Sequence, residues 1–258
     1  MGKEARSEVH DRHVVDIATR GDRRVSDVLT GFFRTSGLPC VVLSEESGKV
    51  NLCAEPLYTV VIDDIDGTDN FFRGDGLLPY CTIISVLSGV RPTFADTVAA
   101  GIIEHRSGAT WLAEKGKVSL LNGVPAHSSQ VKELNRRTLV AIDHYGSSTE
   151  ISKLAPLHAG AWIKDFGSAG FHLAGVASGM FDAYVTTGQK GHEIAAGYLL
   201  ITEAGGSISD FDGRGMDAKL FDFGAKYEII AAGNQTLARL IVSALHSTNF
   251  LTSSGGPR

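Results

Sequence analysis

Residues 60–72 read VVIDDIDGTDNFF, an apolar β-branched strand that runs directly into three acidic residues. Acids at the end of a strand project into the crevice where open α/β sheets bind ligands. Asp63 and Asp66 are three positions apart across a predicted turn, so both carboxylates and the Ile65 carbonyl between them can face one cation. Mg²⁺ takes such hard oxygen ligands and keeps its other positions for water and phosphate. This stretch therefore predicts a magnesium site at a strand end.

A Gly67-Thr68 pair follows these acids and predicts a phosphate contact. Glycine lets the backbone approach an anion closely, and the amides of both residues would hold it if they open a short helix. The alternative is a solvated Asp-Gly turn between strands. Two other segments weigh against that alternative. Residues 41–48 (VVLSEESG) also end a strand in acids, Glu45 first, and Glu193 lies at the start of an apolar helix.

The composition is that of an ordinary globular protein. The chain has 258 residues, 43% of them hydrophobic, and a net charge of −5 from 24 basic and 29 acidic residues. Such a chain can bury a large core as one domain or as two halves. Mild acidity predicts no binding to nucleic acid or to anionic membranes, because both need clustered Lys and Arg. Three cysteines without CxxC spacing and a start without a hydrophobic signal core favour the reducing cytoplasm.

Hydrophobic patterning predicts two halves that share one compact unit. The N-terminal half, 1–136, is α+β and carries the metal-binding acids, with a helix over 17–35 and strands at 39–44, 57–62, 80–88, 98–104 and 109–114. The C-terminal half, 137–258, alternates as α/β, with strands 139–143, 161–166, 181–186 and 228–232 and helices 168–178 and 193–204. A final helix is predicted after Asn234, which is a good N-cap.

Four segments carry a resemblance to a known family: SEE, DDIDGTDNF, FGSAGFHLAGVASG and HEIAAGYLLITEAGG…SDFDG. In this order they resemble the signatures of the inositol monophosphatase superfamily, the Mg²⁺-dependent, lithium-sensitive sugar phosphatases. The likeness runs from about Val14 to the final helix. It looks closest to the archaeal dual inositol monophosphatase/fructose-1,6-bisphosphatase. The resemblance implies an α/β (α+β) fold of layered αβαβα type and a homodimer.

The resemblance also implies roles for individual residues. The metal ligands would be the carbonyl of Ile65 and the carboxylates of Glu45, Asp63, Asp66 and Glu193, holding about two to three Mg²⁺ ions or, alternatively, Mn²⁺.

The same family resemblance assigns catalytic roles to Asp22, Glu45 and Thr68. The Thr68 hydroxyl and Asp22 would orient the attacking water. Asp22 alternatively caps the first helix. Substrate would be bound by Asp66, Gly67, Thr68, Lys164, Gly167, Ser168 and Thr186. Ser168 is equally well interpreted as an ordinary helix N-cap.

His192-Glu193 stands where the family usually has Trp-Asp. Glu193 is one methylene longer than Asp, so it can still ligate while the geometry and the metal preference shift. His192 is interpreted as a packing histidine, with an added metal ligand or a proton carrier as alternatives.

Two other departures concern the substrate and the front of the chain. Thr186 occupies the position, seven residues before Glu193, where eukaryotic inositol enzymes hold substrate hydroxyls with an acid. A broader range of sugar phosphates is therefore expected. Only 44 residues precede Glu45, fewer than in relatives, so the chain is expected to be truncated or to start late. Among the remaining acids, Glu46 and Asp64 are expected to face water or to make ordinary hydrogen bonds. Asp69 is expected to face solvent, with an addition to the metal cluster as the alternative.

The first functional hypothesis is a Mg²⁺-dependent phosphomonoesterase acting on small polyol or sugar phosphates, with inositol-1-phosphate and fructose-1,6-bisphosphate as leading substrates. One alternative is a phosphatase for 3′-phosphoadenosine 5′-phosphate. The other is a non-catalytic, metal-dependent binding protein on the same scaffold.

Overall fold

The computed structural model describes residues 9–12, 17–143 and 148–247 of the chain. It begins with an antiparallel ribbon of β1 (Val9–Arg12) and β2 (Ile17–Thr19), which leads into helix α2 (Arg20–Ser36). The predicted helix over 17–35 is therefore wrong at its first turn. The backbone of residues 17–19 instead pairs with β1, five to ten positions earlier in the chain.

The first sheet has eight strands in the order β10-β9-β8-β7-β6-β5-β3-β4. Its strands are antiparallel to their neighbours except for β3 and β5, which run parallel. The strands are β3 (Cys40–Ser44), β4 (Gly48–Asn51), β5 (Tyr58–Asp66), β6 (Cys81–Ser88), β7 (Thr97–Glu104), β8 (Ala109–Glu114), β9 (Leu120–Leu121) and β10 (Val124–Pro125). Helix α3 (Thr68–Arg73) follows β5, and a 3₁₀ turn, η1 (Phe94–Asp96), precedes β7.

The second sheet has five strands in the order β12-β11-β13-β15-β14. The strands are β11 (Leu139–Asp143), β12 (Trp162–Lys164), β13 (Ala183–Lys190), β14 (Ser207–Ser209) and β15 (Lys226–Ala232). The helices of this half are α4 (Ser148–Gly160), α5 (Ala169–Ala177), α6 (Gly191–Glu203) and α7 (Gln235–Leu245). The predicted boundary at 136–137 falls between the two sheets, and the division into halves stays a prediction.

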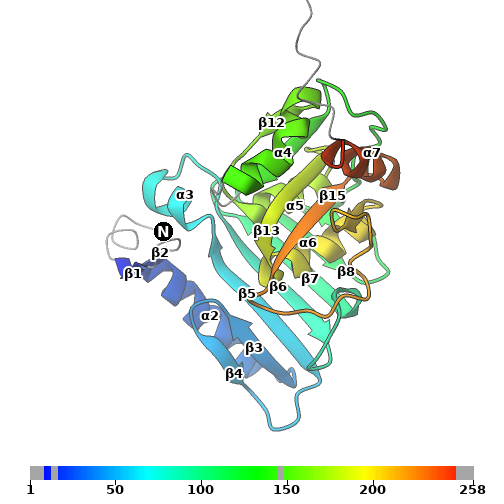
Figure 1. The fold of residues 1–258 in the computed structure, drawn as a ribbon. Helices are drawn as coiled ribbons and strands as arrows, with labels where there is room; N and C mark the ends of the chain where they lie inside the picture. Colours follow the sequence, from blue (N-terminus) through cyan, green and yellow to red (C-terminus); the bar gives the residue numbers. More distant parts are fainter. Residues whose placement is uncertain (1–8, 13–16, 144–147, 248–258) are drawn as a thin grey trace, which may run out of the picture.

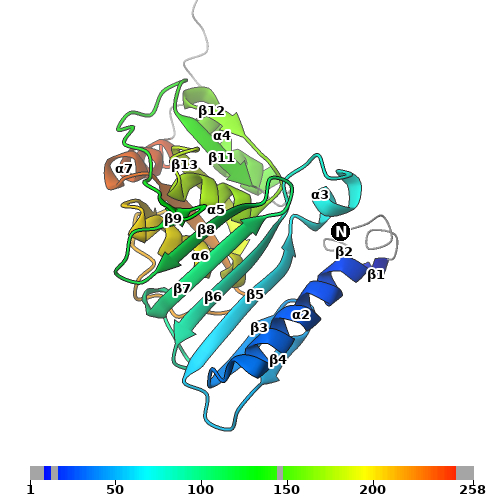
Figure 2. The same ribbon diagram turned by 180° about the vertical axis from the view of Figure 1, so that it is seen from behind.

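The layers of the molecule follow the order helix, sheet, helix, sheet, helix (Figures 1 and 2). Helix α2 covers the outer face of the first sheet, where Phe33 packs with Val42 and Ile62. Helices α5 and α6 lie between the sheets, and α4 and α7 cover the outer face of the second sheet through Leu157 and Ile241. The predicted αβαβα sandwich is confirmed.

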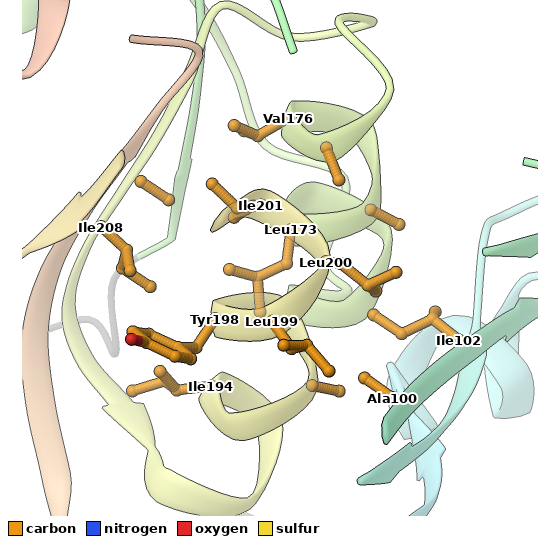
Figure 3. Packing of buried hydrophobic residues seen from close by; sticks show 14 of the residues in the cluster. Ala100, Ile102, Leu173, Val176, Ile194, Tyr198, Leu199, Leu200, Ile201 and Ile208 are labelled. Carbon is orange, nitrogen blue, oxygen red and sulfur yellow. The ribbon is translucent and has the colours of Figure 1, made fainter. Parts of the chain in front are cut away.

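The central helices are apolar or small on every side because both of their faces are buried. Figure 3 shows α6 side chains between Ala100 and Ile102 of the first sheet and Ile208 of the second. Small residues let the two helices approach closely: a Cβ on Gly197 of α6 would lie 2.7 Å from Leu173 Cδ1 of α5. The starts of both helices are thereby held between the sheets.

Most of the other predicted elements are present, and two N-caps are confirmed. Ser168 accepts a hydrogen bond from the Phe171 amide at the start of α5, and Asn234 accepts one from the Leu237 amide at the start of α7. The sequence does not predict α4, which contains Pro156 and lacks a clear apolar stripe. Its apolar residues find their partners only in the assembled second sheet.

Candidate active site

A cavity of about 420 Å³ lies where the two sheets and the starts of α5 and α6 converge. It collects residues from six separate segments, which the assembled fold brings together. Its lining is Glu45, Asp63, Ile65, Asp66, Gly67, Thr68, Asp69, Asn70, Asp143, Gly167, Ala169, Lys190, Glu193 and Lys226. Nine of these are acidic, basic or amide side chains, so the cavity is suited to a charged ligand.

A β-bulge brings Asp63 and Asp66 to the same side of β5. The sequence predicts a turn here, but β5 stays paired with β6 up to Asp66, and the register shifts between these two residues. In a regular strand, residues three apart point to opposite faces. The extra residue of a bulge cancels that alternation. Oxygen atoms of Asp63, Asp66 and Glu193 lie within 4.8 Å of one another as a result.

Asp66 is held by the N-terminus of α5. Its Oδ1 accepts from the amide of Ala169 at 3.0 Å, and its Oδ2 accepts from the amide of Gly170 at 2.8 Å and from the Ser168 hydroxyl. A Cβ on Gly170 would lie 3.0 Å from Asp66 Oδ2 and 2.8 Å from Ile83 Cδ1, so only glycine permits this approach. Burial raises the pKa of Asp66 to about 6, although the three hydrogen bonds oppose the shift.

Glu193 lies in the first turn of α6 and caps it. Its Oε2 accepts a hydrogen bond of 3.0 Å from the amide of Lys190. The carboxylate is buried, and burial together with the nearby charge of Asp66 raises its pKa well above the usual value. Glu193 thus faces the cavity from the C-terminal half of the chain while Asp63 and Asp66 face it from the N-terminal half.

Asp63 lies at the centre of the acidic residues. It is 2% exposed, and its Oδ1 has no hydrogen-bond partner among the described residues. Burial raises the pKa of Asp63 well above its usual range, and the charges of Glu45, Asp66 and Glu193 raise it further. A second group of potential ligands, Glu45, Asp63 and His192, shares Asp63 with the first group.

These carboxylates fit divalent cations. Several acids in one buried cluster repel each other, and their pKa values are raised because hydrogen bonds and nearby positive charge offset burial and repulsion only in part. Oxygen-rich sites of this kind suit Mg²⁺, Ca²⁺ or Mn²⁺. The buried Asp63 Oδ1 is the clearest single position for such a ligand, because a metal ion would satisfy it.

The Gly67-Thr68 pair lines the cavity at the start of α3. Gly67 adopts φ +83°, and a Cβ there would lie 3.0 Å from the Gly167 carbonyl oxygen, so the residue must be glycine. Helix α3 begins at Thr68, whose hydroxyl donates a 2.9 Å hydrogen bond to the carbonyl of Ile65. The proposed phosphate contact through these amides stays a prediction.

Asn70 is a residue of the site that the sequence did not single out. Its Nδ2 donates to the carbonyls of Pro79 at 2.8 Å and Phe166 at 2.6 Å, so it ties α3 to the loop before α5. That loop contains Gly167, which also lines the cavity. No short-range pattern could predict this clamp, because Asn70 and Phe166 are 96 positions apart.

Four predicted site residues lie outside the cavity lining. Asp22 is buried near the start of α2, within the helix and not at its N-cap. Lys164 is exposed, with Nζ 5.3 Å from the centre of the Trp162 ring. Thr186 is fully buried in β13, and Ser168 reaches the site only through Asp66. The catalytic or substrate contacts expected of these four residues stay predictions.

Three charged residues line the cavity that the sequence analysis did not name. Asp143 ends β11, and it lies opposite Thr186 in the parallel pairing of β11 with β13. Lys190 and Lys226 face each other across the pairing of β13 with β15. An acid at the end of an apolar strand was the signal that identified Asp63, and the same signal is present at Asp143.

Asp64 is buried and makes ordinary hydrogen bonds. It is 1% exposed, and its Oδ2 accepts hydrogen bonds from the Ser44 hydroxyl at 2.8 Å and from the Glu46 amide at 3.3 Å. Burial raises the pKa of Asp64 to about 6 and that of Glu46 to about 7, and the charge of Asp22 contributes to both shifts. Asp64 therefore fixes the turn that carries Glu45 and does not face water.

The sequence pattern of the inositol monophosphatase family matches residues 1–249. The chain belongs to this family. One relative within it is the fructose-1,6-bisphosphatase/inositol-1-monophosphatase of Methanothermobacter thermautotrophicus, which is 28% identical over 87% of this chain and 81% of its own length. Another is the Nus factor SuhB of Xylella fastidiosa, 30% identical over 92% of this chain and 84% of that protein.

Solved structures share the inositol monophosphatase fold with this chain. The SuhB protein of Bartonella henselae superposes with a TM-score of 0.79 at 23% identity, over 93% of this chain and 89% of that one. The IMPase of Thermotoga maritima superposes with a TM-score of 0.75 at 20% identity, over 92% of this chain and 87% of that one.

In the part of the chain that the structure describes, no helix is both long enough and apolar enough to span a bilayer.

Proposed function

We propose that the protein is a Mg²⁺-dependent phosphomonoesterase that hydrolyses inositol-1-phosphate, fructose-1,6-bisphosphate or both. Membership of the inositol monophosphatase family makes it a phosphoric monoester hydrolase acting on sugar phosphates. The observation that carries the proposal is the pair of ligand groups that share Asp63 at the cavity wall.

The residues that would hold the metal are Glu45, Asp63, Asp66 and Glu193, with the carbonyl of Ile65. Bound divalent ions supply two kinds of chemistry, which are activation of a water molecule and neutralisation of charge on the leaving oxygen. Phosphoryl transfer otherwise asks the protein mainly for positioning and charge. The chain supplies position through the bulge and through the rigid hold of α5 on Asp66.

The remaining lining residues would bind and orient the substrate. Lys190 and Lys226 bring positive charge to the cavity and would attract the phosphate. The Gly67 and Thr68 amides would hold phosphate oxygens, and the Thr68 hydroxyl with Asp22 would orient the attacking water. A volume of about 420 Å³ is in the range of ordinary small-molecule sites and suits a sugar or polyol phosphate.

The proposal includes a homodimer in the cytoplasm. Support for the reducing compartment comes from Cys40, Cys53 and Cys81, none of which forms a disulfide. Support for the dimer comes from the family resemblance.

The experiment is phosphate release by the full chain with and without Mg²⁺. The panel contains inositol-1-phosphate, fructose-1,6-bisphosphate, glycerol phosphates and 3′-phosphoadenosine 5′-phosphate. The test variant is Asp63→Asn, and the control is Asp212→Asn, which removes an exposed acid. We expect release that requires Mg²⁺ and falls at least about a hundredfold in Asp63→Asn only.

Two outcomes would contradict the proposal, and a third would change only its substrate. Full activity of Asp63→Asn would show that the metal site takes no part in the reaction. If no substrate in the panel releases phosphate while Mg²⁺ still raises the melting temperature, the non-catalytic binding protein would be favoured. Preference for 3′-phosphoadenosine 5′-phosphate would support the phosphatase activity but assign it a different substrate.

A further inference from the structure

We propose that His192 is a nitrogen ligand of a divalent metal ion that Glu45 and Asp63 also bind. This inference rests on the metal site proposed above and adds a ligand to it. It makes one metal position a mixed nitrogen and oxygen site, which favours a transition metal such as Mn²⁺ over Mg²⁺.

The first support is the geometry around the imidazole. His192 is 2% exposed, and its Nε2 lies 3.6 Å from Asp63 Oδ2 and 3.7 Å from Glu45 Oε2. Both separations are longer than a charge-assisted hydrogen bond, which is about 2.7–2.9 Å. Both are shorter than twice a metal–ligand bond of about 2.1 Å. One ligand atom from each of Glu45, Asp63 and His192 lies within 4.8 Å of the others, so an ion placed among them could bind all three after a small side-chain movement.

The second support is the orientation of the ring. His192 Nδ1 lies 3.0 Å from the carbonyl oxygen of Phe223. A carbonyl only accepts, so Nδ1 carries a proton, and whenever the ring is neutral Nε2 presents its lone pair toward the carboxylates. Metal-binding histidines are held in this way, with the distal nitrogen donating to a carbonyl or carboxylate.

The third support is that the backbone fixes the ring in this place. Gly191 allows the start of α6 to press against the chain at Asp222, because a Cβ there would lie 2.0 Å from the Asp222 carbonyl oxygen. The same approach brings the Phe223 carbonyl to His192 Nδ1, and the two rings stack with centroids 4.5 Å apart. The imidazole is thus held rigidly, as a ligand needs to be.

Glu45 divides its two oxygens between different partners. Oε1 accepts a 2.6 Å hydrogen bond from Lys190 Nζ, and Oε2 is the oxygen nearer to His192. Asp63 contributes Oδ2 on the same side. One carboxylate oxygen from each acid is therefore directed to the proposed position.

The alternative is that His192 only packs against Phe223. Packing alone would be equally well served by an aromatic residue, and it would give no preference among metals. A nitrogen ligand instead raises affinity for Mn²⁺, Co²⁺ or Zn²⁺ relative to Mg²⁺, because imidazole suits transition metals and Mg²⁺ prefers oxygen.

The test is pulsed electron paramagnetic resonance of Mn²⁺ bound to the full chain without substrate. The echo modulation of the wild type is expected to show nitrogen coupling, and labelling histidine with ¹⁵N should change that coupling. His192→Phe should abolish it and lower Mn²⁺ affinity by about tenfold or more, with a smaller change for Mg²⁺ in calorimetry. His246→Gln, which removes an exposed histidine, should leave all of these values unchanged.

The wild-type labelling experiment keeps the test valid if His192→Phe fails to fold. Mn²⁺ that binds with no histidine nitrogen coupling would overturn the role of His192 and leave the oxygen site intact. Absence of any divalent binding by the wild type would overturn both this inference and the proposed function, so the two failures are distinguishable.

Discussion

Lys190 donates a 2.6 Å hydrogen bond from Nζ to Oε1 of Glu45, across 145 positions of the chain. It joins the end of β13 to the turn after β3, and both residues line the cavity. An ammonium group beside these carboxylates offsets part of their repulsion. It also competes with a metal ion for the charge of Glu45.

Replacing Lys190 with Met should therefore strengthen metal binding. The pair is partly exposed, with 26% and 31% of the two side chains accessible, so the effect is modest. We expect the Mg²⁺ dissociation constant to fall by roughly two- to fivefold, measured by calorimetry. Lys117→Met breaks an exposed surface pair with Glu114 and serves as the control. Weaker Mg²⁺ binding in Lys190→Met would show that the ammonium supports the site and does not compete with the metal.

Ser168→Ala should reduce both stability and activity. The hydroxyl caps α5 through the Phe171 amide and donates to Asp66 Oδ2. Loss of a cap costs about 1 kcal/mol of unfolding free energy. Asn234→Ala removes the equivalent cap of α7, away from the cavity, and should cost a similar amount while leaving kcat unchanged. Urea unfolding and steady-state kinetics separate the two effects, and equal kcat values in both variants would exclude a role of Ser168 in positioning Asp66.

Asp143→Asn should weaken substrate binding without weakening metal binding. Asp143 lines the cavity and is paired in register with Thr186, the position where the resemblance places an acid that holds substrate hydroxyls. A hydrogen bond to a charged group contributes about 1.5–3 kcal/mol, so KM for inositol-1-phosphate should rise roughly tenfold or more. The Mg²⁺ dissociation constant should stay unchanged. An unaltered KM would show that the acid on β11 does not contact the polyol.

His172 should make the protein less stable as the pH falls from 7 to 5. It is fully buried, accepts a 3.0 Å hydrogen bond from the Phe166 amide, and burial lowers its pKa to about 3. The unfolded chain binds a proton near pH 6.5 while the native ring does not, so stability is present above that pH and is lost below it. This group alone should cost roughly 2 kcal/mol by pH 5.

His172→Gln removes that titration, since Oε1 of Gln can replace Nε2 as acceptor. The variant should be less stable at pH 7 but should lose about 2 kcal/mol less than the wild type on going to pH 5, measured by urea unfolding. His246→Gln, at an exposed position, should follow the wild-type curve. Parallel curves for His172→Gln and wild type would contradict the assignment.

Local sequence was sufficient for several elements of the site. Residues 60–62 are β-branched and apolar, and Ser168 and Asn234 are N-caps, because strand propensity and capping depend on near neighbours. The types of the metal-binding side chains are likewise readable, since Glu and Asp are the ligands of hard cations. Family membership followed from the order of the four motifs and was confirmed by the match over residues 1–249.

The directions in which the site side chains point, and the residues that they contact, are determined only by the tertiary structure. The bulge that turns Asp66 toward Asp63 depends on pairing between β5 and β6. The placement of Lys190 against Glu45, and of His192 between Glu45 and Asp63, depends on the meeting of two sheets. These contacts join residues more than a hundred positions apart, so no periodicity can encode them. The sequence by itself determined which groups could bind a metal, while tertiary packing decided which of them lie close enough together to bind the same ion.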